Sequence, residues 1–327
     1  MSHEVYENDK VAYVEGSAMP WHRKNCVTFK PDESLREQWD RTSLNYTVAL
    51  KDLAIVSDGR PVPNKAIVRT DNGEILGVAG PQWRPMQPHD VRDSLEELVD
   101  DDTIALHTAG SLKNGRRMWA QCTINGHDDT AEIVKGDEIR QFYTIAQGLD
   151  YVLGVHCGFT RIRTVCDNTL QASMAEGRFV RIKHNRLVVD NVRQLIDSID
   201  WSTQELSMSI EKYQFLAKRG CRPSDLRKYV RLVLDVKPEV EWDDLHSRSQ
   251  NIVRRVEQLF ETGKGNDNPH AKGTWWAAYN GMTEYLSHER GRTAENRQDT
   301  LWFGTGRKTL DVALKAAVRF ADASTVA

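Results

Sequence analysis

Two Asn-Gly pairs, each flanked by apolar segments, constrain the fold of this chain more than any other feature of its sequence. Asn and Gly together favour the two-residue turns of β-hairpins, because both residues tolerate positive φ angles. The pairs are Asn72-Gly73, between Ala66–Arg69 and Ile75–Val78, and Asn114-Gly115, between Thr103–Leu112 and Arg116–Ile124. The sequence therefore predicts an antiparallel sheet of hairpins in the first half of the chain.

A third pair of apolar strands is expected within Gln141–Met174, joined by the turn Gly148-Leu149-Asp150 and followed by a helix from about Asp167 to Gly177. With the hairpin at Thr103–Ile124, this order of elements resembles a β-β-β-α core known from another class of proteins. Alternate residues of a strand share a face. In the return strand we expect one core face and one basic and aromatic face: Met118, Ala120, Cys122 and Ile124 against Arg117, Trp119, Gln121 and Thr123.

Apolar residues repeat at helical spacing after Asp190. The segments are Leu206–Leu216, Leu226–Val233, Leu245–Leu259, Trp275–Leu286 and Thr309–Phe320. The sequence thus predicts an α+β protein, with a core domain at residues 1–190 and a helical region at residues 191–327. That region would pack on the core or on a neighbouring subunit.

Composition narrows the classes of partner. The formal net charge of −3 over 327 residues argues against coating nucleic acid by bulk charge, so an anionic partner would need local basic patches. We expect no membrane partner, because no run of eighteen apolar residues and no apolar leader is found. Five cysteines without framework spacing fit a reducing cytoplasm.

A local basic patch is the strongest chemical signal. Arg161 and Arg163, two positions apart, would lie on one side of a strand. Basic residues also follow that strand and occupy the second hairpin tip, and aromatic residues lie among them. As phosphate and base contacts we predict Lys113, Arg116, Arg117, Trp119, Phe159, Arg161, Arg163, Arg181 and Lys183. The alternative is a set of solvated strand faces with ordinary core aromatics.

Other chemistries are weakly indicated. His156, Cys157, Cys166 and His184 could ligate zinc, but the cysteines lie nine positions apart and buried thiols are commoner. No base is placed for a catalytic thiol. In Gly304–Thr309, Arg307 interrupts the Gly-Lys-Thr of a phosphate loop. We therefore predict no metal, no cofactor and no catalytic residue.

The aromatic segment Trp275–Glu289 allows two interpretations. It can be a helix clamped against the β domain or a neighbouring subunit. It can also carry a polar site, because Asn280, Glu284 and His288 recur at every fourth position.

Several motifs occur in an order that resembles a known family. They are Pro20-Trp21-His22, Gly110-Ser111-Leu112 with Gly115-Arg116-Arg117, Arg163-Thr164-Val165-Cys166-Asp167-Asn168-Thr169-Leu170, and Tyr279-Asn280 with Glu284-Tyr285 and His288. The chain resembles the phage/plasmid-like protein family, catalogued as domain of unknown function 932, over about residues 15 to 320. The resemblance implies a mobile-element protein acting in a bacterial cytoplasm.

The order of elements from Ile104 to Met174 is also distantly similar to the core of single-strand annealing proteins of the Rad fifty-two and Red-beta types. This analogy implies a ring or filament that holds single-stranded DNA in a basic groove without ATP. We therefore expect a single-stranded DNA-binding, strand-annealing protein that assembles with itself, with a host or phage replication protein as a further partner. The alternatives are a protein-binding module, such as an inhibitor of a host defence system, and an enzyme using Asn280, Glu284 and His288.

Overall fold

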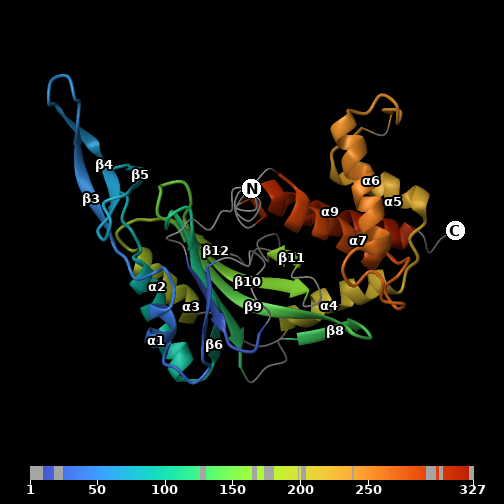
Figure 1. The fold of residues 1–327 in the computed structure, drawn as a ribbon, viewed down its shortest axis with the longest axis horizontal. Helices are drawn as coiled ribbons and strands as arrows, with labels where there is room; N and C mark the ends of the chain where they lie inside the picture. Colours follow the sequence, from blue (N-terminus) through green and yellow to red (C-terminus); the bar gives the residue numbers. More distant parts are fainter. Residues whose placement is uncertain are drawn as a thin grey trace. The chain divides into compact units, whose positions relative to one another are not determined.

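The computed structural model describes residues 10–17, 25–125, 130–163, 168–172, 180–197, 199, 204–237, 239–291, 300–301 and 305–323. Only the backbone is described for residues 163, 168–172 and 204–209. The chain forms two compact units (Figure 1). Unit 1 comprises residues 1–127, 142–159 and 176–201, and unit 2 comprises residues 128–141, 160–175 and 202–327.

The larger sheet in the described part of the chain has nine strands, and seven of them form the centre of unit 1, in the order β12-β10-β9-β7-β6-β1-β2. These strands are β1 (Val11–Val14), β2 (Cys26–Phe29), β6 (Ile104–Leu112), β7 (Arg117–Ile124), β9 (Asp137–Gly148), β10 (Val155–Arg163) and β12 (Val180–Ile182). Strands β9 and β10 contribute residues 142–148 and 155–159 to this unit. The predicted hairpin at Asn114-Gly115 is confirmed, with Leu112 paired to Arg117.

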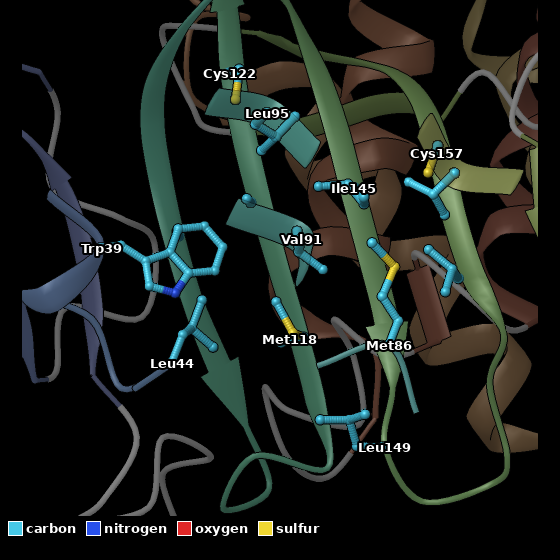
Figure 2. Close-up of a cluster of buried hydrophobic side chains, with 14 of the residues drawn as sticks. Trp39, Leu44, Met86, Val91, Leu95, Met118, Cys122, Ile145, Leu149 and Cys157 are labelled. Atoms are coloured by element: carbon cyan, nitrogen blue, oxygen red, sulfur yellow. The ribbon is translucent and has the colours of Figure 1, made fainter. Parts of the chain in front are cut away.

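Three helices pack together beside this sheet: α1 (Leu35–Asp40), α2 (Pro88–Asp100) and α3 (Val188–Asp197) (Figure 1). A capping box between Ser34 and Glu37 starts α1. Helix α2 turns Val91 and Leu95 towards the strands, where Figure 2 shows them beside Ile145. These side chains belong to the buried apolar core that holds the sheet in place.

A separate three-stranded sheet of unit 1 has the order β3-β4-β5, formed by β3 (Val48–Ala54), β4 (Pro61–Arg69) and β5 (Ile75–Ala79). The predicted hairpin at Asn72-Gly73 joins β4 to β5, and Gly73 has a φ of 77°. The β3–β4 hairpin projects away from the helices of unit 1 (Figure 1). Its tip exposes two apolar side chains, Ile55 and Val56.

Unit 2 is mainly helical. It contains α4 (Gln204–Ala217), α5 (Pro223–Val233), α6 (Ser247–Thr262), α7 (Trp275–Glu284), the π-helical turn η2 (Tyr285–Glu289) and α9 (Thr305–Ala323). All ten residues of α7 are buried, because α4, α6 and α9 pack around this helix. Two short strands, β8 (Thr130–Val134) and β11 (Asn168–Ala172), pair with β9 and β10.

The predicted α+β class is confirmed by the antiparallel sheets and the helical C-terminal region. The predicted helix from Asp167 to Gly177 is wrong where it is described, because Asn168–Ala172 forms β11. Pairing with Thr160–Arg163 of β10 satisfies backbone groups that this strand edge would otherwise leave open. The helical unit also takes in residues 128–141 and 160–175, in addition to those after residue 201.

The second face of β7 also differs from the prediction. Arg117, Trp119, Gln121 and Thr123 are as buried as the core residues that alternate with them. A strand enclosed on both faces cannot offer a basic and aromatic strip to solvent. Among the helices in the described part of the chain, none has the length and apolarity needed to cross a membrane.

Candidate nucleic-acid interface

Three turns of unit 1 lie at the same end of its sheet. Arg117 at the start of β7 pairs with Gly148 at the end of β9, and Val155 at the start of β10 pairs with Ile182 at the end of β12. The turns at residues 113–116 and 149–154 and the loop at residues 183–187 are therefore neighbours. With strands about 4.8 Å apart, the distance from β7 to β12 is about 14 Å.

Backbone contacts join these turns. The Leu149 amide donates to the Arg116 carbonyl at 2.9 Å, and the Arg84 amide donates to the His184 carbonyl at 3.3 Å. Gly154 lies so close to β12 that an added Cβ would be 2.6 Å from the Ile182 oxygen. Four segments far apart in the sequence thus meet at one edge.

We call the cationic side chains of this edge the basic rim. Arg84 and the three cations at and after β12 are exposed, and the two cations of the β6–β7 turn are half-buried. Within the described residues, no carboxylate pairs with Arg84, Arg181, Lys183 or Arg186. Among these residues the Arg84 guanidinium donates only to the carbonyls of Pro81 and Trp83. The rim consists of Arg84, Lys113, Arg116, Arg181, Lys183 and Arg186.

The β6–β7 turn is fixed by hydrogen bonds to unit 1's smaller sheet. The Tyr46 hydroxyl donates to the Gly115 carbonyl at 2.7 Å, and Arg69 Nη1 donates to the Asn114 carbonyl at 2.9 Å. Arg116 donates to the carbonyls of Ile75 and Leu76 on β5 and forms an ion pair with Glu74 at 3.3 Å. Arg116 therefore covers the open edge of β5 and is only partly available to another anion.

Three predicted contacts of unit 1 are enclosed. Arg117 is 5% exposed and forms an ion pair with Asp150. Trp119 is 5% exposed, and Phe159 is 7% exposed, with its ring edge-on to Tyr143 at 5.7 Å. None of the three can touch a nucleic-acid strand in this conformation, so we leave them out of the interface.

Arg161 and Arg163, which were predicted to lie on one side of a strand, belong to unit 2. Arg161 is 2% exposed, and its charge lies close enough to the Tyr279 hydroxyl to lower the pKa of that group. Burial nevertheless dominates and raises the pKa of Tyr279 well above its usual value, with a further rise from Asp311. The side chain of Arg163 lies outside the described residues. Arg161 is therefore an interior cation and not a surface phosphate ligand.

The proposed zinc ligands are interior groups where they are described. Cys157 is buried, which raises the pKa of its thiol to about 12 and keeps it protonated. Burial lowers the pKa of His184 to about 4, and the ring lies against Trp83 with a centroid distance of 5.1 Å. The fourth proposed ligand, Cys166, lies outside the described residues. Among the described side chains, no group of three potential ligands gathers as a metal site would require.

The polar residues of α7 and η2 lie inside unit 2. Asn280 is fully buried, and among the described residues neither its amide nitrogen nor its oxygen has a hydrogen-bond partner. Glu284 is 9% exposed and accepts the Lys264 amide at 3.0 Å, while His288 lies on the π-helical turn. Helices α4, α6 and α9 of the same unit enclose α7, whereas the structural interpretation placed this helix against the β domain or a neighbouring subunit.

Sequence reasoning missed two residues of the basic end of unit 1. Arg84 lies in the loop between β5 and α2 and belongs to no sequence pattern, so only the tertiary contact with His184 reveals it. Tyr151 follows the predicted Gly148-Leu149-Asp150 turn and is 53% exposed. An aromatic residue at the tip of a predicted turn was a signal that could have identified it.

Comparison with known proteins gives one match. A family model described as a domain of unknown function, DUF932, matches residues 75–302. No curated protein and no solved structure matches the chain.

Proposed function

The chain belongs to the DUF932 family, and since that family's description assigns no function, we propose from the basic rim that the protein binds single-stranded DNA and anneals complementary strands. One observation carries the proposal: three separate segments bring six cations, four of them exposed and two half-buried, to a single end of the unit 1 sheet. Cations that converge in this way neutralise a phosphate backbone and release its counterions.

The rim has dimensions that suit a single strand. The rim is about 14 Å wide, which is about the length of a few nucleotides of a single strand. Single-strand binding folds hold about 4 to 16 nucleotides at one site. The rim is also backed by a sheet, so the backbone positions from which its cations extend are fixed before a ligand arrives. Binding would leave bases free to pair with a second strand, and self-assembly of a phage or mobile-element protein would add cooperativity along the DNA.

Fluorescence anisotropy with labelled single- and double-stranded oligonucleotides at two salt concentrations tests binding. We expect tighter binding to single strands and weaker binding at the higher salt concentration. The double variant Arg181→Glu/Lys183→Glu should lose most of the affinity, while Lys218→Glu/Lys237→Glu, with the same charge change on exposed residues of unit 2, should not. Equal behaviour of the two variants would refute the interface.

Annealing is tested separately, by energy transfer between two labelled complementary strands mixed with the protein. Faster pairing than in protein-free buffer is the expected result. Size-exclusion chromatography with light scattering on the same sample measures whether the protein assembles with itself. If the protein is a monomer and does not anneal strands, the annealing part of the proposal fails and only DNA binding remains.

A protein partner is the second candidate, favoured by the tip of the β3–β4 hairpin. Val56 is fully exposed and Ile55 is 40% exposed. Two adjacent apolar side chains at the end of a projecting hairpin suit a protein surface better than a phosphate backbone. Under this candidate, purified protein would not bind oligonucleotides at any salt concentration.

A further inference from the structure

The turn at residues 149–154 lies in the middle of the basic rim and presents an aromatic residue. Tyr151 is 53% exposed, and the neighbouring Val152 is 71% exposed. Gly154, at the end of the turn, lies against Arg181: an added Cβ would be 3.3 Å from its Nε. An exposed aromatic ring among cations is the arrangement with which proteins stack unpaired bases.

The backbone of Tyr151 is held in an unusual conformation. Its φ of 71° lies in the left-handed region, which bulky aromatic residues rarely adopt because of contact between Cβ and the backbone. Such a conformation persists only where the surroundings fix it, and it is found most often at functional sites. In this strained conformation the ring of Tyr151 is turned outwards, away from the core.

Contacts on both sides fix the turn. The Asp150 carboxylate forms the ion pair with Arg117 and accepts the Val152 amide at 3.1 Å. The Asp150 carbonyl lies so near Gly77 that an added Cβ there would be 2.6 Å away. The hydroxyl of Tyr151 lies against Gly80, 3.0 Å from where a Cβ would stand. The hydroxyl end of the side chain thus lies close to Gly80, while Tyr151 as a whole stays 53% exposed.

We propose that Tyr151 stacks on an unpaired base of the bound strand and gives the rim its preference for single-stranded over double-stranded nucleic acid. This inference rests on the proposed function. The rim cations contact phosphates, which both forms of DNA have, so they cannot by themselves select single strands. A stacking side chain can, because paired bases expose no face to it. A ring held in place before binding loses little conformational freedom when a base arrives.

The test compares two labelled strands of about 20 nucleotides: oligothymidylate, and an abasic strand with the same phosphates. Wild-type protein should bind oligothymidylate about 5- to 150-fold more tightly, the range expected for one stacked base. Tyr151→Asn should bind both strands alike, because Asn accepts the left-handed backbone while removing the ring. Tyr151→Phe should keep the preference, and Val56→Ala, on the distant hairpin tip, should not change it.

Each outcome decides a different point. If wild-type protein binds both strands equally, or if Tyr151→Asn keeps the preference, the stacking role is refuted while binding at the rim stands. If neither strand binds, the proposed function itself fails, and the inference fails with it. Thermal unfolding of Tyr151→Asn near the wild-type temperature excludes loss of folding as the cause.

Discussion

Two regions of the molecule use arginine in opposite ways. At the sheet end of unit 1, Arg84, Arg181 and Arg186 lie in solvent, and no described carboxylate pairs with them. Around β10 and α7 of unit 2, Arg161 is almost fully enclosed, and its charge acts on a buried tyrosine. Exposed cations can attract an anionic ligand, whereas an enclosed cation is already committed to the fold. Counting basic residues in a segment does not separate these two roles.

The largest expected effect comes from the one arginine of the rim turns that is enclosed. Arg117→Ala should lower the free energy of unfolding by about 3–5 kcal/mol, because it leaves the Asp150 carboxylate buried without its partner. Urea denaturation measures this change. Arg181 lies at the same end of the sheet but is exposed. Arg181→Ala should therefore change the free energy of unfolding by no more than about 0.5 kcal/mol. Similar losses in both variants would mean that burial does not distinguish the two arginines.

Acid should weaken the basic end of unit 1 through His184. The native ring stays neutral down to about pH 4, whereas the unfolded ring takes up a proton near pH 6.5. The unfolded state therefore binds more protons between these values, and stability falls as the pH drops from about 6.5 to about 4, by about 3 kcal/mol. Thermal unfolding across this range measures the effect.

His184→Phe is the matched variant for that experiment. Its ring can keep the contact with Trp83 but cannot be protonated. Its stability should depend less on pH than that of the wild type. A wild-type profile that is flat between pH 6.5 and 4 would contradict the burial of a neutral histidine.

In the interior of unit 2, two buried asparagines should respond in opposite directions. Asn280→Leu should raise the free energy of unfolding by about 1–3 kcal/mol, because it removes an amide that has no partner. Asn266→Leu should lower it by about as much, because the Asn266 amide donates to the carbonyls of Leu259 and Ala277. Chemical denaturation of both variants tests the pair, and a loss of stability in Asn280→Leu would show that its amide is satisfied.

A smaller effect is expected at the tip of the β6–β7 turn. Gly115 has a φ of 87°, and an added Cβ would be 2.7 Å from the Tyr46 hydroxyl. Gly115→Ala should therefore cost about 1–2 kcal/mol and move Lys113 and Arg116 out of the rim. Gly59→Ala on the β3–β4 hairpin has a similar φ but open space around it, so it isolates the cost of the backbone.

Local signals predicted much of this fold. The two Asn-Gly turns, the strands beside them and the helices after Asp190 follow from turn chemistry and periodicity, which act within a few residues. The helix predicted over Asn168–Ala172 is wrong because Asp167 and Gly177 match the residue types that cap helices, whereas no Asn-Gly pair between β10 and this segment signals their antiparallel pairing. The second face of β7 was assigned to solvent because alternation shows which side chains share a face, but not what covers that face.

The site was predictable only in part. Arg181 and Lys183 are exposed as expected, and the prediction that they bind DNA stays a prediction. Trp119, Phe159 and Arg161 carry the same residue types and lie inside, because burial depends on contacts between distant segments. Arg84 joins the rim through one backbone hydrogen bond to residue 184, which no local pattern indicates.

The central claim is that Arg181, Lys183 and Arg186 contact phosphates. The salt dependence of DNA binding tests this claim most directly. The slope of log K against log[salt] changes by about 0.7 for each phosphate contact with a single strand. Arg181→Gln/Lys183→Gln/Arg186→Gln should therefore flatten the slope by about 2, whereas Lys218→Gln/Lys237→Gln/Lys272→Gln, with an identical change in net charge on unit 2, should leave it unchanged. Equal slopes for the wild type and the rim variant would contradict the account.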